Sequence, residues 1–208
     1  MNKEWCNEKL EMLSLRLSGF KPNPAEFFFE PTEAVYKKLE SGDEDDLQYV
    51  VAEMARHLHI SPIPPVKYDW GLKMEPEVAG QIKAASPIRS IRIPLFYAGR
   101  KYALGCILAH EMTHVFLFSR GIWLDNTDEN EMVTDLAGVF VGLSKLLLNG
   151  LTFMANEDSS ERIVLGYLSP ELIVYCYERV NALRKVLSPV ASENLVPEAQ
   201  SKLRSHSI

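Results

Sequence analysis

The feature that most restricts the fold of this chain is a run of mostly apolar residues from about 102 to 119. A helix that is apolar on nearly every face lies in the interior of a protein, and Gly121 just beyond the run is a typical helix end. The run also contains three strongly polar side chains, His110, Glu111 and His114. Burying polar groups costs free energy unless they find partners. The run therefore predicts a buried helix that carries a polar site.

The two histidines of this helix are spaced to share a metal ion. Residues four positions apart lie on one face of a helix, about one turn from each other, and His110 and His114 could therefore bind one zinc ion. Glu111 lies beside the first histidine, where its carboxylate can reach a water on the metal without binding the metal. Zinc lowers the pKa of that water, and the carboxylate can take its proton. The alternative is two histidines that bind nothing, which the apolar surroundings disfavour because the imidazoles would be buried without partners.

A third ligand is expected from the segment that follows. Catalytic zinc usually has three protein ligands and one open position. An extended three-histidine motif fails, because Leu117 stands where that motif has glycine and Arg120 where it has histidine. Glu131 and Asp135 are again four residues apart on a predicted helix. One of the two carboxylates can bind zinc, and the other can accept the second ring N–H of His110 or His114.

This arrangement resembles the gluzincins, the thermolysin-like clan of zinc metallopeptidases. The resemblance rests on His-Glu-x-x-His at 110–114 and on Glu-x-x-x-Asp at 131–135 of the next predicted helix, and it covers roughly residues 66–148. The order of strands, active-site helix and glutamate helix is similar to that of the compact minigluzincins. The resemblance implies that Zn²⁺ is the cofactor, that Glu131 is the third ligand and that Asp135 orients a histidine. It also implies a peptide or protein substrate.

Two further groups of residues are candidates for binding or catalysis. In gluzincins an edge strand pairs with the extended substrate, and the run 88–93, followed by Pro94, is expected to form such a strand here; an ordinary edge strand is the alternative. The substrate-binding candidates on it are Ser90, Ile91, Arg92 and Ile93. Tyr167 precedes a predicted helix that is capped by Ser169 and Pro170, and a rigid turn there could aim its phenol at the cleft to stabilise an oxyanion. The alternative is that Tyr167 only packs.

The remaining patterns predict an α+β fold with a small, mostly antiparallel sheet packed on the active-site helix and the glutamate helix. Three parts are expected: a helical N-terminal extension (1–60), a metallopeptidase-like domain (61–187) and a flexible tail (188–208). Elements within them are predicted from hydrophobic periodicity, capping residues and breakers. The expected helices are 1–18, 43–59, 102–119, 128–148 and 170–187, and the expected strands are 66–70, 78–84 and 88–93.

Composition narrows the partners and the compartment. The net charge of −6 argues against a protein that binds the phosphate backbone of nucleic acids. Three widely spaced cysteines form no disulfide framework and suit free thiols in a reducing compartment. Glutamates interrupt the stretch where a signal peptide would be apolar, and no apolar run approaches about eighteen residues. A cytoplasmic protein without membrane or nucleic-acid partners is expected, and its oligomeric state stays open.

The expected activity is peptide-bond hydrolysis with Glu111 as the general base. A zinc-binding domain that no longer cleaves and instead binds a regulatory partner is the first alternative, although Glu111 is needed only for catalysis. A metal-free structural protein is the second, and a highly selective peptidase of a regulatory pathway is the third. Latency is also expected, with residues 1–42 and the tail from Ser188 covering the cleft.

Overall fold

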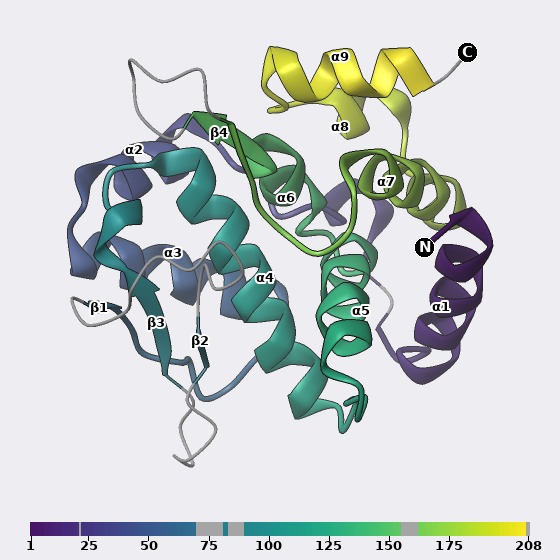
Figure 1. Cartoon of the computed structure of the whole chain (residues 1–208), viewed down its shortest axis with the longest axis horizontal. Coiled ribbons are helices and arrows are strands. Elements are labelled where there is room, and N and C mark those ends of the chain that lie inside the picture. The colour runs from purple at the N-terminus through teal and green to yellow at the C-terminus, as the bar shows by residue number, and fades with distance from the viewer. Residues whose placement is uncertain (21, 70–80, 83–89, 155–161, 207–208) are drawn as a thin grey trace.

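The computed structural model describes residues 1–20, 22–69, 81–82, 90–154 and 162–206. This part of the chain is mostly helical, with a few short strands (Figure 1). The helices are α1 (Lys3–Arg16), α2 (Glu33–Ser41), α3 (Glu44–His57), α4 (Lys101–Ser119), α5 (Thr127–Phe140), α6 (Ser144–Gly150), α7 (Pro170–Arg184), α8 (Ser188–Ser192) and α9 (Pro197–His206). The strands are β1 (Val66–Asp69), β2 (Gln81–Ile82), β3 (Ile91–Pro94), β4 (Thr152–Met154) and β5 (Arg162–Val164), and short 3₁₀ turns are η1 (Pro24–Glu26) and η2 (Leu95–Tyr97).

Capping residues explain why several helices begin where they were expected to. The side chain of Asp43 accepts hydrogen bonds from two backbone N–H groups in the first turn of α3. Asn126 caps α5 and Ser169 caps α7 in the same way, with Pro170 at the first position of α7. The predicted helices at 43–59, 102–119 and 170–187 are confirmed to within a few residues. α2 was not predicted.

The helix predicted over 128–148 is broken into α5 and α6 at Gly142. This glycine has φ of +93°, and a Cβ on it would lie 2.0 Å from the backbone oxygen of Phe27. Its own carbonyl accepts a hydrogen bond from the N–H of Phe29 at 3.0 Å. The N-terminal connector therefore passes so close to this point that only glycine fits, and the chain must leave the helix there.

The expectation of a mostly antiparallel sheet with 88–93 at its edge is wrong. β3 lies in the middle of a three-stranded sheet of order β1-β3-β2. β1 pairs with β3 in parallel from Val66 opposite Ile91 to Asp69 opposite Pro94, and only two residues of β2 pair antiparallel to β3. Pro94 is tolerated because it is the last residue of the strand, and the side chains of Ile91 and Ile93 are fully buried. A second, antiparallel pair is formed by β4 and β5, and the coarser class α+β describes the whole.

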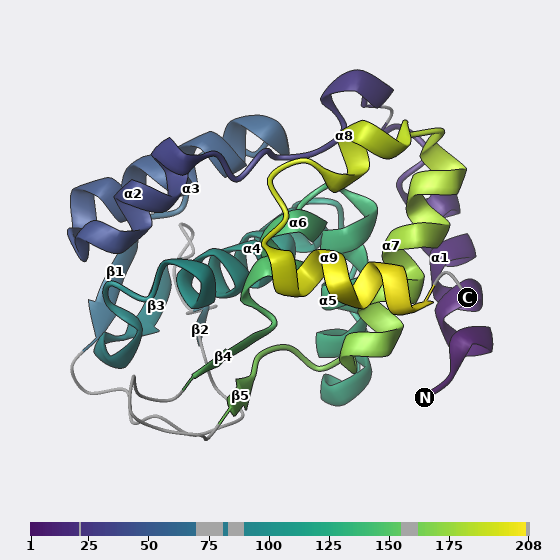
Figure 2. The ribbon, with the colours of Figure 1, turned by 90° about the horizontal axis from the view of Figure 1, so that it is seen from above.

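Helix α4 forms the centre of the core. Its side chains are buried along nearly the whole helix, and it packs against α2, α3, α5 and α6 (Figures 1 and 2). α1 lies beside α5 and α7 at one side of the molecule. Buried residues of α1, α2 and α3 therefore belong to the same core cluster as α4. Among the described residues, no helix combines the length and hydropathy that a membrane crossing requires.

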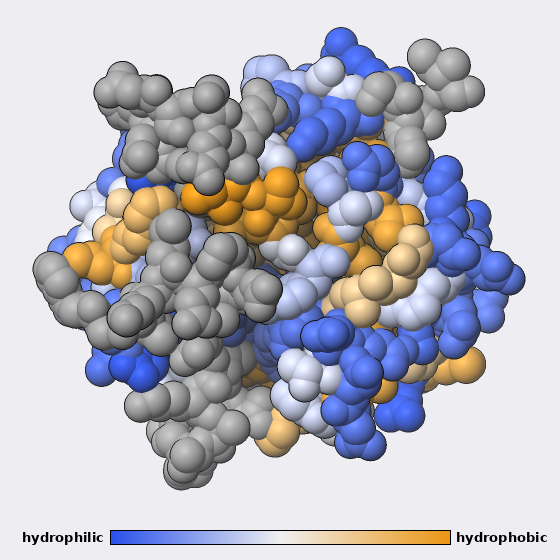
Figure 3. Space-filling view, viewed as in Figure 1, coloured by the Kyte–Doolittle hydropathy of each residue, from blue (hydrophilic) through white to orange (hydrophobic). Residues whose placement is uncertain are grey.

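The C-terminal segment, expected to be a loosely ordered tail, instead forms α8 and α9. Leu195 and Ala199 are buried, and the fully buried Lys145 of α6 holds the segment by donating to Val190 O at 2.8 Å. The same ammonium group donates to both carboxylate oxygens of Glu30, at 2.6 and 2.8 Å. Hydrophilic residues cover the outer faces of α1 and α9 (Figure 3). Both ends of the chain thus pack on the core, and trimming them as the latency hypothesis requires would expose apolar surface.

Candidate metal centre

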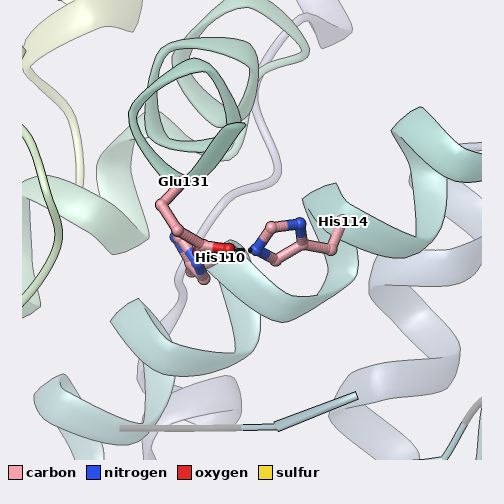
Figure 4. A group of neighbouring side chains, drawn as sticks. All are labelled: His110, His114 and Glu131. Atoms are coloured by element: carbon pink, nitrogen blue, oxygen red, sulfur yellow. Dashed lines mark hydrogen bonds and ion pairs between the residues drawn. The ribbon is translucent and has the colours of Figure 1, made fainter. Parts of the chain in front are cut away.

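Two packed helices bring the predicted ligands together. His110 and His114 lie one turn apart on α4, and Glu131 lies in the first half of α5. The connection between the helices is held by the buried Asn130, whose side-chain oxygen accepts the N–H of Leu124 at 3.1 Å. Figure 4 shows the Glu131 carboxylate reaching from α5 to the two imidazole rings.

Three potential ligand atoms converge on one point. The Nε2 atoms of His110 and His114 are 3.0 Å apart. Oε2 of Glu131 lies 3.0 Å from the first nitrogen and 2.9 Å from the second. In the described part of the chain this is the group of side chains that could hold a metal ion.

The proton on the other ring nitrogen of His110 is set by Asp135. Oδ1 of Asp135 lies 2.8 Å from Nδ1 of His110. A carboxylate can only accept, so Nδ1 carries the proton and donates it to this bond. In the neutral imidazole, Nε2 of His110 then presents a lone pair to the convergence point.

Thr134 sets the tautomer of His114. Its hydroxyl donates to the carbonyl oxygen of Asn130 at 2.8 Å and lies 3.2 Å from Nδ1 of His114. Since the only hydroxyl proton is used on Asn130, the oxygen accepts from Nδ1–H of His114. Nε2 of His114 therefore also presents a lone pair. Thr134 was not predicted, although its position three residues after Glu131 places it on the same face of the helix.

When both imidazoles are neutral, the three converging atoms are all acceptors and no donor lies between them. Two imidazole lone pairs and a carboxylate oxygen within 3.0 Å repel one another unless a cation or an extra proton lies among them. A divalent metal ion fits this donor set, because imidazole nitrogen and carboxylate oxygen are common ligands of first-row metals. His110, His114 and Glu131 could hold such an ion.

The pKa values of these groups reflect the same arrangement. Burial disfavours the charged form of His110, but hydrogen bonds to Asp135 and Glu131 outweigh it and raise the pKa of His110 to about 10. Burial also favours neutral Glu131, but hydrogen bonds to the two histidines lower the pKa of Glu131 to about 2. A second proton on His110 can therefore take the place of a metal ion in balancing the acceptors.

Glu111 is buried next to the ligands, with 4% of its surface exposed. Burial raises the pKa of Glu111, whereas the charges of His110 and His114 lower it. Its carboxyl group therefore lies within electrostatic reach of both histidines without belonging to the converging group.

Asp135 is anchored from a third element, the turn between β5 and α7. Its Oδ2 accepts the backbone N–H of Tyr167 at 2.6 Å and that of Leu168 at 3.0 Å. The ring of Tyr167 stacks on the ring of His110, with centroids 5.5 Å apart, while the side chain is 43% exposed. The ring of Tyr167 thus lies beside His110, whereas the oxyanion role of its phenol stays a prediction. The contact of its backbone with Asp135 was not predicted. The flanking Gly166 is the sequence signal that could have indicated it.

The substrate-binding candidates of the predicted edge strand lie in or directly before β3, the middle strand of the sheet. Ile91 and Ile93 are fully buried, and Arg92 pairs with Asp69 of β1 by an ion pair. β3 has neighbours on both sides, so it lacks the free edge that pairing with a substrate backbone requires. Ser90 directly precedes this strand.

Replacing Asp135 should weaken metal binding, and asparagine should be worse than alanine. In Asp135→Asn the amide oxygen is expected to accept from Tyr167 and Leu168, which turns the NH₂ group towards Nδ1 of His110. That donor would favour the tautomer with a proton on Nε2, which cannot bind metal. Loss of an orienting partner costs about ten- to a hundred-fold in affinity. We expect about tenfold for Asp135→Ala and about a hundredfold for Asp135→Asn, measured by Zn²⁺ competition with a chromophoric chelator. Zinc affinity of Asp135→Asn equal to or higher than that of Asp135→Ala would contradict the tautomer argument.

The case for this site rests on the residues of this chain. The rings of His110 and His114 are held through their Nδ1 atoms by Asp135 and Thr134 of α5, and Asp135 is held in turn by the backbone N–H of Tyr167 in the β5–α7 turn. The three ligands come from α4 and α5, whereas the residues that orient them also include the β5–α7 turn. Comparisons with models of known protein families, with curated proteins and with solved structures find no match to this chain.

Proposed function

We propose that this protein is a zinc-dependent peptidase of the gluzincin type. His110, His114 and Glu131 hold the metal, and Glu111 is the general base. The observation that carries the proposal is the convergence of three acceptor atoms within 3.0 Å beside a buried glutamate. A metal site that only stabilised the fold would need no carboxylate besides its ligands, whereas hydrolysis needs a general base such as Glu111 beside the first histidine.

Zinc is the metal that this site suits best. Two histidines and one glutamate leave one position of a tetrahedral ion open for water or substrate, which is the arrangement of catalytic zinc. When bound, zinc lowers the pKa of its water and polarises a carbonyl group. We further infer a cytoplasmic protein, supported by the three cysteines that are free thiols in the structure.

Different side chains have different roles in hydrolysis. Glu111 accepts a proton from the attacking water and later returns it to the leaving amine. Asp135 and Thr134 hold His110 and His114 with their Nε2 lone pairs on the ligand side. The stacked ring of Tyr167 forms an exposed wall of the site beside His110.

Zinc content and peptide cleavage test the proposal together. Full-length protein should retain about one zinc ion per chain after dialysis and cleave members of a peptide library. Cleavage should stop with a chelator and return when zinc is added back. Bound zinc without cleavage would point instead to a metal-binding protein that recognises a partner. Folded protein without zinc would overturn the metal centre.

Tyr167→Phe should lower turnover about a hundred- to a thousand-fold on a cleaved substrate. We infer that its phenol donates a hydrogen bond to the oxyanion of the tetrahedral intermediate, and losing one such donor has this cost. Phenylalanine keeps the stacking on His110 and the backbone N–H bond to Asp135, so zinc affinity should stay unchanged. Tyr175→Phe on α7 is the control, because its hydroxyl donates to Asn7 on α1. Unchanged turnover in Tyr167→Phe would dispose of the oxyanion role.

A further inference from the structure

The turn that joins β5 to α7 holds a single carboxylate oxygen with two consecutive backbone amides. Tyr167 N–H and Leu168 N–H both donate to Oδ2 of Asp135, at 2.6 and 3.0 Å. Asp135 is 1% exposed, so water does not compete for this oxygen. Hydrogen bonds to an ionised acceptor are about twice as strong as neutral ones. The turn therefore fixes the rotation of the carboxylate.

The rotation of the Asp135 carboxylate decides how His110 is held. With Oδ2 bound to the turn, Oδ1 is left facing Nδ1 of His110 at 2.8 Å. A chain of hydrogen bonds thus runs from the β5–α7 turn through Asp135 to a ligand on α4. Three elements that are distant in sequence contribute to it.

Gly166 makes this close approach possible. It has φ of +90°, a conformation that residues with a side chain rarely adopt. A Cβ on it would lie 3.0 Å from Oδ2 and 3.5 Å from Oδ1 of Asp135. Any side chain here would push against the carboxylate that the next two amides bind.

We propose that Gly166 is a positioning residue of the metal centre, which sets metal affinity by letting residues 166–168 clamp Asp135. The inference rests on the proposed metal ligands but not on peptide hydrolysis. Metal binding and formation of the clamp are thermodynamically linked. If the clamp raises the affinity for metal by some factor, bound metal stabilises the clamp by the same factor.

The first experiment compares two glycines that have similar backbone strain. Gly42 at the end of α2 has φ of +72°, and a Cβ there would meet only Gly99 N at 3.8 Å. Gly166→Ala and Gly42→Ala should therefore both lose stability. Zn²⁺ competition with a chromophoric chelator should show about tenfold weaker binding in Gly166→Ala alone, within the range for partners that orient a ligand. Equal affinity in both variants, with the wild type binding zinc, would overturn the inference and leave the metal centre intact.

A double-mutant cycle separates the clamp from a general loss of structure. Removing the carboxylate in Asp135→Ala removes the group that Cβ of residue 166 would contact. Adding Gly166→Ala to Asp135→Ala should then change zinc affinity by less than about twofold, because the two changes act through one interaction. A full further tenfold loss in the double variant would show that Gly166 acts by another route and would overturn the proposal.

Hydrogen exchange gives a readout that requires no enzymatic activity. Adding Zn²⁺ to wild-type protein should slow exchange of the Tyr167 and Leu168 amides. Gly42→Ala should show the same slowing, and Gly166→Ala a smaller one. Wild-type protein that binds no zinc would refute the proposed metal centre itself, whereas zinc binding with unchanged exchange of both amides would refute only the clamp.

Discussion

Glu111→Gln is expected to abolish peptide hydrolysis while zinc remains bound at full stoichiometry. Glutamine has the shape of glutamate, so the neighbouring ligands should keep their positions. The amide cannot take a proton from water, and losing a general base costs about a hundred- to ten-thousand-fold in rate. Since the Glu111 side chain is buried, replacing a carboxyl with a neutral amide should not lower the stability of the fold.

The measurement is turnover of a cleaved peptide beside zinc content after dialysis. Glu33→Gln is the control, because Glu33 is an exposed residue in the first turn of α2 whose ion pair with Lys37 contributes little. Loss of zinc together with activity in Glu111→Gln would mean that Glu111 supports the metal. Full activity would remove Glu111 from the mechanism.

Glu131→Ala is expected to release the metal. Binding of a structural zinc ion is worth about 10–16 kcal/mol, or about 2.5–4 kcal/mol for each of four ligands, so losing one ligand should weaken binding about a hundred- to a thousandfold. Two histidines would remain, and zinc should be lost on dialysis. The protein should stay folded, because the side chain of Glu131 is partly exposed and the core around α4 is apolar.

Glu129→Ala is the matched control for Glu131→Ala. Glu129 lies in the first turn of the same helix, and its carboxylate pairs with Lys9 rather than with the histidines. It should keep its zinc. Full zinc in Glu131→Ala beside empty Asp135→Ala would show that Asp135 is the ligand. Full zinc in His110→Ala as well would leave no metal site.

The sequence by itself determined several of the helices and the polar residues of α4. Helical periodicity and the His-Glu-x-x-His spacing need only the geometry of one helix, so His110, Glu111 and His114 could be placed on a buried helix from local pattern alone. Capping by Asp43, and by Ser169 with Pro170, is equally local.

The tertiary structure decided how carboxylates and strands are used. The residues left open which of Glu131 and Asp135 meets the metal; the structure places Glu131 at the Nε2 atoms and Asp135 at Nδ1 of His110. The two carboxylates have different roles because the packing of α4 on α5 brings Glu131 to the Nε2 atoms, whereas the backbone of the β5–α7 turn binds Asp135. A pattern within one helix cannot specify that third element.

Long-range packing also explains the failures of local pattern. The parallel pairing of β1 with β3, the break at Gly142 and the order of the C-terminal segment each depend on residues far away in the chain. The contact between Gly142 and Phe27 cannot be read from the local sequence around Gly142. The polar tail is likewise ordered by hydrogen bonds that join Val190, Asn194 and Val196 to Lys145 and Asn149 of α6. The local sequence determines which backbone conformations have low free energy, whereas contacts between distant segments decide which of them the folded chain adopts.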